Sequence, residues 1–432
     1  MSSPLIIMLF LFILFMATRI PLSFAMILSA ALYMLLVDKP LDMVAHLMFN
    51  GINTFTLLAI PFFVLASELM VMSGTAEKLL DFANMLVGGF RGGLAYVNVL
   101  ASMMFGGCSG SAIADVAGLG RLEIELMEKG GYEKPFSTAI TVSSSIQGPL
   151  IPPSIPMVLI GAVTGSSVGA LLVGGAIPGV LVGVSQCVVI WYYGKKRGFP
   201  VNPVKMSASA KLKLCIQSIP FILMPLIIVG GIISGWFTPT EASGVAVCYG
   251  FLLTIIYKAG RVPTLSLLKD LRGVFSRSVL TAASILLLSG ASNVFGWILT
   301  TERVPVLISD TLTSMTDNKY LVLMLVNIFL LIWGMVMDSL PAITIILPIL
   351  FPLAQNLGID PIHFGIIVVL NLVLGLTTPP VGVCLFVTSS IGKISLYEAS
   401  KGVMPFLLGN LVILALVTYV PFLTLGLVNL LF

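Results

Sequence analysis

Two short clusters of small and hydroxyl-bearing residues have the composition of a monovalent-cation site. The first, GGCSGS, occupies residues 106–111, and the second, DSLP, occupies residues 338–341; each lies between two apolar runs. Glycine frees backbone carbonyls, and the serines add neutral oxygen atoms. Such a shell suits a hard monovalent cation, and unwound carbonyls at the ends of half-helices bind sodium in known transporters. For residues 106–111 the alternative is packing, because small residues let membrane helices approach closely.

A second pair of clusters, in which glycine and proline interrupt an apolar segment, follows the first pair at similar spacing. They are QGP at residues 147–149 and GLTTPP at residues 375–380. The segments 150–181 and 377–408 also match without gaps, so that their Pro-Pro pairs coincide. Paired Gly/Pro interruptions in two halves of a membrane protein indicate discontinuous helices around a central site. The pattern predicts a secondary transporter with one cation site in each half.

Two acidic residues lie near these clusters. An ionisable residue in a membrane segment indicates function, and for Asp115 we expect a functional or structural partner in the interior. For Asp338 the alternative is a helix cap, because this residue directly precedes the sequence SLP. These two acids also keep proton coupling open as the rival of sodium coupling. The capping box TPTE at residues 238–241 is explained by local hydrogen bonding alone.

Catalysis is the competing class of function. GCSG at residues 107–110 fits the GxSG sequence around the nucleophile of rhomboid intramembrane proteases. A serine nucleophile needs a base within hydrogen-bonding reach, and only His363 is a plausible partner for Ser109. Because the motif is short and a protease gives the second cluster no role, we expect a transporter without catalytic residues.

The elements that position these clusters must be membrane helices. The chain has 432 residues, of which 58% are hydrophobic and 9% charged, whereas about 25% of residues are charged in a soluble protein. The apolar runs are long and continuous, unlike the alternating strands of a membrane β-barrel. The five cysteines occur singly, without a CxxC motif, so no metal or redox cofactor is expected. The net charge of +4 indicates no nucleic-acid partner.

Basic residues set the expected orientation in the lipid bilayer. Two stretches should be cytoplasmic by the positive-inside rule; they contain Lys195, Lys196, Arg197, Lys205, Lys211 and Lys213, and then Lys258, Arg261, Lys269, Arg272 and Arg277. Between them we expect a helical hairpin formed by residues 215–234 and 240–257. A mixed-charge loop at residues 121–134 should also be cytoplasmic.

This orientation predicts an inverted repeat. The first Pro-Pro segment, residues 136–160, should run outward, and the second, residues 363–388, should run inward. The intervening apolar pair, residues 320–337 and 340–353, could dip into the membrane and return or form two full spans. In both cases the pair makes an even number of membrane crossings, so the predicted direction of the second Pro-Pro segment is the same.

Four motifs resemble one transporter family. GCSGSAIAD at residues 107–115, IPPS at 151–154, FTPTEA at 237–242 and LTTPPVG at 376–382 are similar to the large membrane subunit of tripartite ATP-independent periplasmic (TRAP) transporters. They occur in the family order and span nearly the whole chain. The resemblance implies an all-α fold of the ion-transporter superfamily. In that fold, two inverted repeats, each with a re-entrant hairpin and a broken helix, move as an elevator against a scaffold.

The resemblance also implies a division of the chain and a set of partners. Residues 1–91, 194–277 and 278–319 would form the scaffold and its connector, and residues 92–193 and 320–432 the two transport repeats. The function would be sodium-driven uptake, across the bacterial inner membrane, of an organic acid delivered by a periplasmic binding protein. Sialic acid, C4-dicarboxylates and sugar acids all remain open. Because Pro4 already begins the large-subunit pattern, we expect the small four-helix subunit to be a separate chain.

By analogy with the family, the clusters supply three sets of ligands. The first sodium ion is assigned to Gly107, Ser109, Ser111, Gln147 and Gly148. The second is assigned to Asp338, Ser339, Gly375, Thr377 and Thr378. The substrate is assigned to Ser109, Pro152, Ser154, Ser339, Thr378 and Pro379. Because no arginine falls in these motifs, a substrate carboxylate would bind to helix N-termini and hydroxyl groups.

Overall fold

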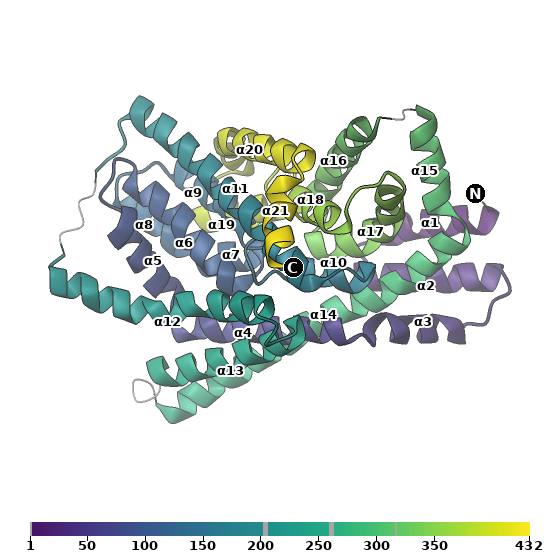
Figure 1. Ribbon diagram of the computed structural model, residues 1–432, viewed down its shortest axis with the longest axis horizontal. Helices are drawn as coiled ribbons and strands as arrows, with labels where there is room; N and C mark the ends of the chain where they lie inside the picture. Colours follow the sequence, from purple (N-terminus) through teal and green to yellow (C-terminus); the bar gives the residue numbers. More distant parts are fainter. Residues whose placement is uncertain (1, 202–205, 259–262, 316–317) are drawn as a thin grey trace.

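The protein is helical throughout the part of the chain that the computed structural model describes (Figure 1). The described residues are 2–201, 206–258, 263–315 and 318–432; Lys205 and Arg261 of the basic stretches lie outside them. Within these ranges, eight helices are long and apolar enough to cross a membrane by length and composition, and one bent pair could form a ninth span. The expected polytopic, all-α class is therefore confirmed.

One layer of helices combines the N-terminal helices up to Ser73 with the central hairpin and the long helix that follows it (Figure 1). It contains α1 (Ser3–Ala17), α2 (Leu22–Leu36), α3 (Asp42–Ile52), η1 (Phe55–Leu58), α4 (Ala59–Ser73), α12 (Ala208–Ile233), α13 (Pro239–Lys258) and α14 (Thr264–Thr301). Helix α14 packs along α2, α3 and α4, and α13 pairs with α4. The hairpin predicted at residues 215–257 is thus present as α12 and α13.

The remaining helices pack together above this layer in Figure 1. They are α5 (Thr75–Val87), α6 (Gly93–Ser109), α7 (Ala112–Gly118), α8 (Gly120–Lys129), α9 (Lys134–Ser144), η2 (Ser145–Gln147), α10 (Ile155–Thr164), α11 (Val168–Arg197), α15 (Val304–Met315), α16 (Lys319–Val336), α17 (Ser339–Asn356), α18 (Pro361–Gly375), α19 (Val383–Gly392), α20 (Leu396–Tyr419) and α21 (Phe422–Leu431). Every residue of α18 from His363 onward is buried. A helix that is apolar all round belongs at the centre of a bundle.

Two helices of this group are interrupted at the Pro-Pro pairs. After α9 and η2, the chain leaves helical geometry before α10 begins at Ile155; after α18, it does so before α19 begins at Val383. The Pro152–Pro153 and Pro379–Pro380 peptide bonds are both cis. Figure 1 shows that α9 and α10 advance in one direction and α18 and α19 in the opposite one.

Two hairpins approach these interruptions. Helices α6 and α7 meet at an angle of 120° across Gly110 and Ser111. Helices α16 and α17 meet at Met337 and Asp338, as the sequence predicts. Both α16 and α17 are long and apolar enough to be full spans, which is one of the two predicted alternatives for this pair.

The first hairpin helix extends into the first predicted cluster. Residues 106–111 were expected to lie between two apolar runs with their backbone carbonyls free, but α6 continues to Ser109. The Gly106 carbonyl accepts a hydrogen bond from the Gly110 N–H, at 3.0 Å, and is therefore not free. A Cβ atom on Gly106 would lie 2.8 Å from the Cα atom of Gly148. The packing alternative thus explains Gly106, and the unwound segment shrinks to Gly110 and Ser111.

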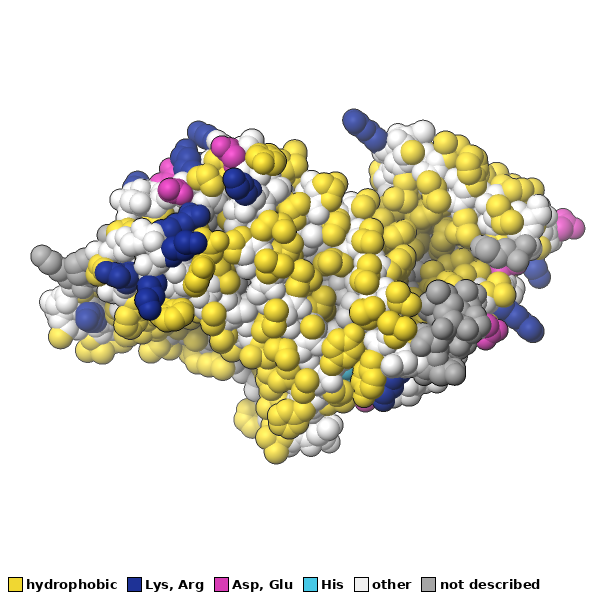
Figure 2. Space-filling view, turned by 90° about the horizontal axis from the view of Figure 1, so that it is seen from above, with side chains coloured by type: hydrophobic (Ala, Val, Ile, Leu, Met, Phe, Trp, Pro, Cys, Tyr) yellow, Lys and Arg dark blue, Asp and Glu magenta, His cyan; other side chains and the backbone are white. Residues whose placement is uncertain are grey.

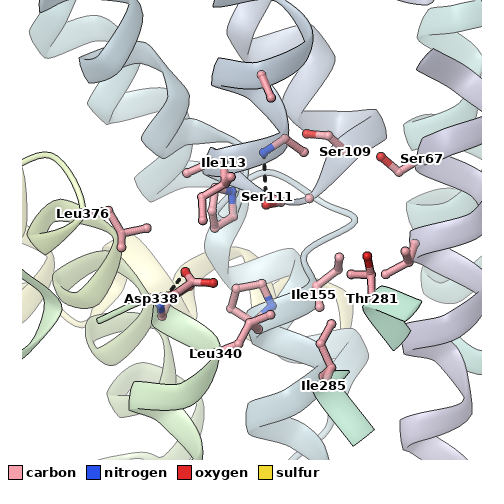
Figure 3. Close-up of a pocket in the computed structure, with 18 of the residues that line it drawn as sticks. Ser67, Ser109, Ser111, Ile113, Ile155, Thr281, Ile285, Asp338, Leu340 and Leu376 are labelled. Carbon is pink, nitrogen blue, oxygen red and sulfur yellow. Dashed lines mark hydrogen bonds between the residues drawn. The ribbon is translucent and has the colours of Figure 1, made fainter. Parts of the chain in front are cut away.

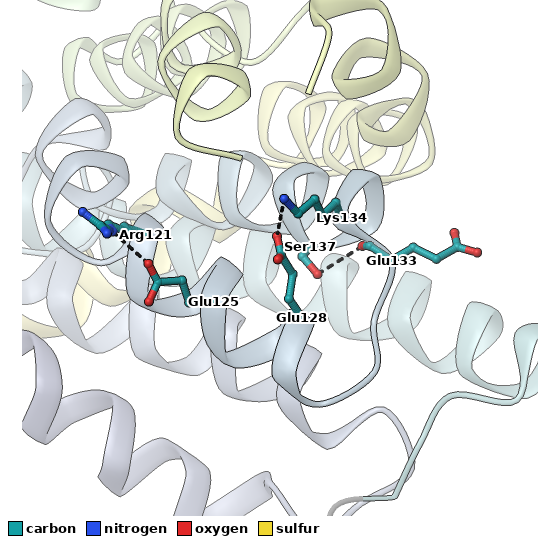
Figure 4. A network of polar contacts seen from close by, with 6 residues as sticks. All are labelled: Arg121, Glu125, Glu128, Glu133, Lys134 and Ser137. Atoms are coloured by element: carbon teal, nitrogen blue, oxygen red, sulfur yellow. Dashed lines mark hydrogen bonds and ion pairs between the residues drawn. The ribbon is translucent and has the colours of Figure 1, made fainter. Parts of the chain in front are cut away.

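The predicted loop at residues 121–134 is also wrong, because most of it forms α8. Arg121 and Glu125 pair at 2.8 Å, and Lys134 approaches Glu128 at 3.7 Å (Figure 4). An i, i+4 ion pair on the exposed side stabilises a helix. On the opposite side, Glu123, Ile124 and Met127 are buried, with the i, i+1, i+4 spacing of a single helix face.

The surface carries its charge at the ends of the molecule. Figure 2 shows Lys and Arg side chains gathered at one end, while apolar side chains cover the middle. Lys195, Lys196 and Arg197 form the last turn of α11, where positive charge interacts favourably with the helix dipole. The apolar band is the surface expected to face lipid.

Candidate functional site

A cavity of about 450 Å³ lies where the two hairpins meet the layer formed by α4 and α14 (Figure 3). Ser109 and Ser111 reach it from the first hairpin, and Asp338 and Ser339 from the second. The first turns of α10 and α17 also border it, through Ile155 and Leu340 among others. The structure therefore brings together clusters separated by more than two hundred residues.

The first predicted cation cluster has an unpaired oxygen in its centre. Ser109 is only 2% exposed, and its hydroxyl has no hydrogen-bond partner among the described residues. Ser111 caps α7 by accepting from the Ala114 N–H at 3.4 Å. Gly148 packs beside this turn, since a Cβ atom there would lie 3.3 Å from the Ser111 carbonyl oxygen. These three residues are neighbours, as the proposed first site requires.

Gln147 adds a second oxygen in the same condition, and Gly107 has a packing role. The Gln147 amide donates to Gln186 at 3.2 Å, while its Oε1 atom has no partner among the described residues. A Cβ atom on Gly107 would lie 2.7 Å from the Pro225 ring. Buried polar atoms are rarely left unpaired. The unpaired Ser109 hydroxyl borders the cavity, whereas Gln147 does not line it and its Oε1 atom lies toward Gly183 on α11.

The second predicted cluster forms where the α18–α19 break packs against the end of α16. The Gly382 N–H donates to the Met335 carbonyl at 3.2 Å, and a Cβ atom on Gly375 would lie 2.5 Å from Gly334. These contacts hold the α18–α19 break against the end of α16. The Thr377 and Thr378 hydroxyls both donate to the Leu374 carbonyl, at 3.0 and 2.7 Å.

Asp338 acts as a helix cap, which was one of its two predicted roles. Its Oδ1 atom accepts from the Ser339 N–H at 2.6 Å and from the Ser339 hydroxyl at 3.2 Å. Asp338 also lines the cavity (Figure 3). Because the cap contacts use only Oδ1, a ligand role for Oδ2 stays compatible with them.

The residues assigned to the substrate separate into two groups. Ser109 and Ser339 line the cavity, whereas Pro152, Ser154, Thr378 and Pro379 do not. The buried Ser154 hydroxyl donates to the Pro149 carbonyl and accepts from the Met157 N–H, which makes it the cap of α10. These four residues belong to the two breaks but not to the cavity surface. Near the breaks, the cavity is lined by Pro149, Ile155, Pro156 and Leu376.

Sequence reasoning missed the opposite wall of the cavity. Ser67 and Glu68 on α4 and Thr281 and Ser284 on α14 line it. Glu68 carried a usable signal, because it is an acid inside an apolar segment. Among the described residues that line the cavity, Glu68 and Asp338 are the only charged side chains.

A buried acidic network lies behind the first hairpin and was also only half anticipated. Asp115 is 2% exposed and Glu123 is 1% exposed. The Ser102 hydroxyl lies 3.3 Å from Glu123 Oε1 and also contacts Asp115. Asp115 Oδ1 and Glu123 Oε2 have no partner among the described residues. The predicted interior partner of Asp115 is thus Ser102, and Glu123 is a second buried acid in the same network.

We expect Glu123→Gln to stabilise the protein by about 1 kcal/mol, because burial penalises a carboxyl group that can ionise, whereas the amide of the same shape carries no charge. The matched control is Glu125→Gln on the exposed side of the same helix, where a change within about 0.5 kcal/mol is expected. Thermal unfolding of the detergent-solubilised protein measures both. A Glu123→Gln variant that is clearly less stable would show that Glu123 has a partner worth more than its burial costs.

The protease alternative fails on geometry. The two ring nitrogens of His363 contact the Thr424 hydroxyl at 2.8 Å and the Thr418 carbonyl at 3.3 Å. Both partners belong to the C-terminal segment, and the Ser109 hydroxyl has no partner among the described residues. Ser109 therefore lacks the base that a nucleophile needs.

Known proteins agree with this architecture. The family described as "Tripartite ATP-independent periplasmic transporter, DctM component" matches residues 9–423. The sialic acid TRAP transporter large permease SiaM of Vibrio cholerae is 40% identical over 407 residues, which cover 94% of each chain. The 2,3-diketo-L-gulonate TRAP transporter large permease YiaN of Escherichia coli is 34% identical and covers 94% of each chain. The C4-dicarboxylate large permease DctM of Pseudomonas aeruginosa is 40% identical and covers 88% of each.

A solved structure extends the likeness to the fold. The YdaH transporter of Alcanivorax borkumensis superimposes with a TM-score of 0.64 over 89% of this chain and 88% of that one, at 12% identity. At that identity the likeness concerns the fold alone. The family match along nearly the whole sequence, and not this likeness of fold, shows that the chain belongs to the DctM component family of TRAP transporters, as a multi-pass permease of the bacterial inner membrane and not an enzyme.

Proposed function

We propose that this chain is the transport subunit of a sodium-coupled symporter that imports an organic acid. The observation that carries the proposal is the cavity between the hairpins, where the buried Ser109 hydroxyl has no partner among the described residues. A cation or an anion that binds only transiently needs an unpaired hydroxyl group, helix-cap residues and broken helices around it. Buried hydroxyl groups are usually paired, so an unpaired hydroxyl at the wall of a cavity is available to a ligand.

The donor set favours sodium as the coupling ion. In the first site, Ser109, Ser111, Gln147 and Gly148 offer hydroxyl, amide and carbonyl oxygens without a carboxylate. The second site offers the Thr377 and Gly375 region with a single acid, Asp338. Divalent cations usually take several carboxylates, whereas few charges and many neutral oxygens suit a monovalent ion.

The substrate is proposed to be a carboxylic acid. The printed names of the relatives describe permeases for sialic acid, C4-dicarboxylate and 2,3-diketo-L-gulonate. The first turns of α10 and α17 border the cavity, and the N-terminus of a helix favours an anion. Ser109 and Ser339 would add hydroxyl donors to the carboxylate.

Transport is proposed to proceed by an elevator movement of two inverted repeats. The opposite directions of α9–α10 and α18–α19 support the inversion (Figure 1). The proposed mobile parts are residues 92–193 and 320–432, which carry both hairpins and both breaks. Residues 1–91 and 194–319, including α4 and α14, would form the static wall. The cavity lies between the two groups, as such a movement requires.

We expect uptake to depend on partner proteins, since the family name implies a periplasmic component. Proteoliposomes with this chain and a separate small subunit should take up labelled N-acetylneuraminate, succinate or 2,3-diketo-L-gulonate only when the cognate binding protein is added outside. The same liposomes without the added protein are the control. Robust uptake by this chain alone would contradict the tripartite proposal, and uptake of none of the acids would contradict the substrate class.

A further inference from the structure

An ion pair joins the two static helices at the edge of the cavity. The Arg277 Nε and Nη2 atoms on α14 lie 3.0 and 2.9 Å from Glu68 Oε2 on α4. Glu68 lines the cavity, and its side chain is 33% exposed. The Arg277 side chain is 62% exposed. The pair is therefore accessible, and an exposed pair of this kind contributes little to folding.

Helix periodicity places Arg277 on the cavity face of α14. Thr281 and Ser284 line the cavity, and Arg277 precedes them by four and seven residues. Positions i, i+4 and i+7 lie on one face of an α-helix. Arg277 is thus the next residue along the cavity-lining stripe, one turn closer to the basic start of α14, which contains Lys269 and Arg272.

The charge of the cavity requires a cation. Glu68 and Asp338 are the only charged side chains among its described lining residues, and both are acidic. The sodium ion proposed at Asp338 would offset one of these charges, but the Glu68 carboxylate would still repel an incoming organic anion unless a cation lies beside it. Arg277 is already held against one of these carboxylates, so its guanidinium is positioned to neutralise the repulsion.

The pairing leaves capacity on the guanidinium. Both printed contacts go to the single oxygen Oε2 of Glu68, although the side edge of a guanidinium can hold two carboxylate oxygens at once. Guanidinium has five N–H donors, and these two contacts use two of its nitrogens. A second carboxylate can therefore share or replace Glu68 without moving the helix.

We propose that Arg277 is the scaffold residue that recognises the substrate carboxylate, and that Glu68 competes with the substrate for it. The inference rests on the proposed function, because it names the residue that binds the substrate carboxylate in that same cavity. Glu68 keeps the guanidinium oriented when no substrate is present and lowers its affinity for the anion, which favours release from the cavity.

The competition gives the two residues opposite effects. Arg277→Gln should weaken binding of an acid, whereas Glu68→Gln should strengthen it, because the released guanidinium then belongs to the substrate alone. A purely structural pair behaves differently, since either substitution breaks the same contact and both effects have the same sign. The sign of the Glu68→Gln effect therefore decides between the two roles.

The test uses the complex of this chain with the small subunit in nanodiscs. It measures the equilibrium binding of labelled N-acetylneuraminate, succinate and 2,3-diketo-L-gulonate, and of the methyl ester of each acid. For the acid that the wild type binds, Arg277→Gln should weaken affinity about tenfold, with the ester unchanged within about twofold. Arg277→Lys should give an intermediate loss. Glu68→Gln should tighten the acid about threefold and slow its dissociation.

Arg272→Gln is the matched control, because it removes the same charge from the same helix away from the cavity-lining stripe; its affinities should stay within about twofold of wild type. Unchanged acid affinity in Arg277→Gln, or a loss in Glu68→Gln equal to that in Arg277→Gln, would overturn the inference. Either result, with acid binding intact in the wild type, leaves the proposed function standing. A wild type that binds none of the acids contradicts the proposed function and this inference together.

Discussion

Ser109→Ala and Ser339→Ala should each reduce sodium-driven uptake by about tenfold or more. Each variant removes one neutral oxygen from a proposed cation site, and a lost ligand that leaves its neighbours unsatisfied costs about 1–3 kcal/mol, or roughly one to two decades in affinity. Uptake into proteoliposomes with an inward sodium gradient measures the effect. The apparent affinity for sodium should fall in parallel. This measurement separates the loss of a sodium ligand from the loss of a contact with the substrate.

Ser29→Ala is the control for these variants. Ser29 is also fully buried, but its hydroxyl donates to the Ala25 carbonyl within α2 and does not line the cavity. Uptake by this variant should be unchanged. Proton coupling remains the rival: full uptake in sodium-free buffer under a pH gradient, abolished by Asp338→Asn, would replace sodium with a proton as the coupling ion.

The breaks were predictable because glycine and proline act through local backbone geometry. The ends of α16 and α17 at Asp338 and of α18 at Gly375 lie within a residue or two of the expected positions. The capping box at Thr238 and Glu241 is present, with the Thr238 N–H 2.8 Å from the Glu241 carboxylate. Such features depend on four to six neighbouring residues, which a single sequence displays completely.

The cavity wall was not predictable, because it depends on contacts between distant segments. Ser67, Ser109, Thr281 and Ser339 come from four helices and meet only in the folded chain. Hydroxyl residues are common in these apolar segments, and nothing local distinguishes Ser67, Thr281 and Ser284, which line the cavity from α4 and α14. Ser109 and Ser339, in contrast, were marked by the glycine and proline residues beside them. Only Glu68 stood out by its type, as an acid in an apolar run.

Glu123 shows a different failure. Five acidic and basic residues crowd residues 121–129, so the segment had the composition of an exposed loop. In the helix that forms there, Arg121 and Glu125 face outward, whereas Glu123 faces the interior beside Ile124. The composition of a segment averages over all faces of the helix, whereas the burial of a residue depends on the face on which it lies. The polar partner of Glu123, Ser102 on α6, is also too far away in the sequence to be inferred.

Gly106→Ala should abolish most transport while leaving the chain inserted in the membrane. Alanine is normally the better helix former, by about 1 kcal/mol over glycine, so α6 itself would not resist the change. The new methyl group, however, would lie 2.8 Å from the Cα atom and 3.1 Å from the backbone nitrogen of Gly148. A backbone cannot rotate away as a flexible side chain can, so α6 and the α9–α10 break must separate, at an overpacking cost of about 1–3 kcal/mol.

The separation acts directly on the first proposed cation site. Gly148 also lies beside the Ser111 carbonyl, since a Cβ atom on Gly148 would be 3.3 Å from that oxygen. A shift of a few tenths of an ångström therefore changes the distances among Ser109, Ser111 and Gln147. Sodium-driven uptake should fall about tenfold or more, with a lower unfolding temperature. Gly244→Ala is the matched control, because Gly244 lies in α13 with nothing within 4 Å of a new Cβ atom; it should keep full uptake. Since Gly106→Ala keeps the carbonyl at this position, its failure separates close packing from ion ligation as the reason for this glycine. Wild-type uptake in Gly106→Ala would show that the hairpin and the break do not need this contact.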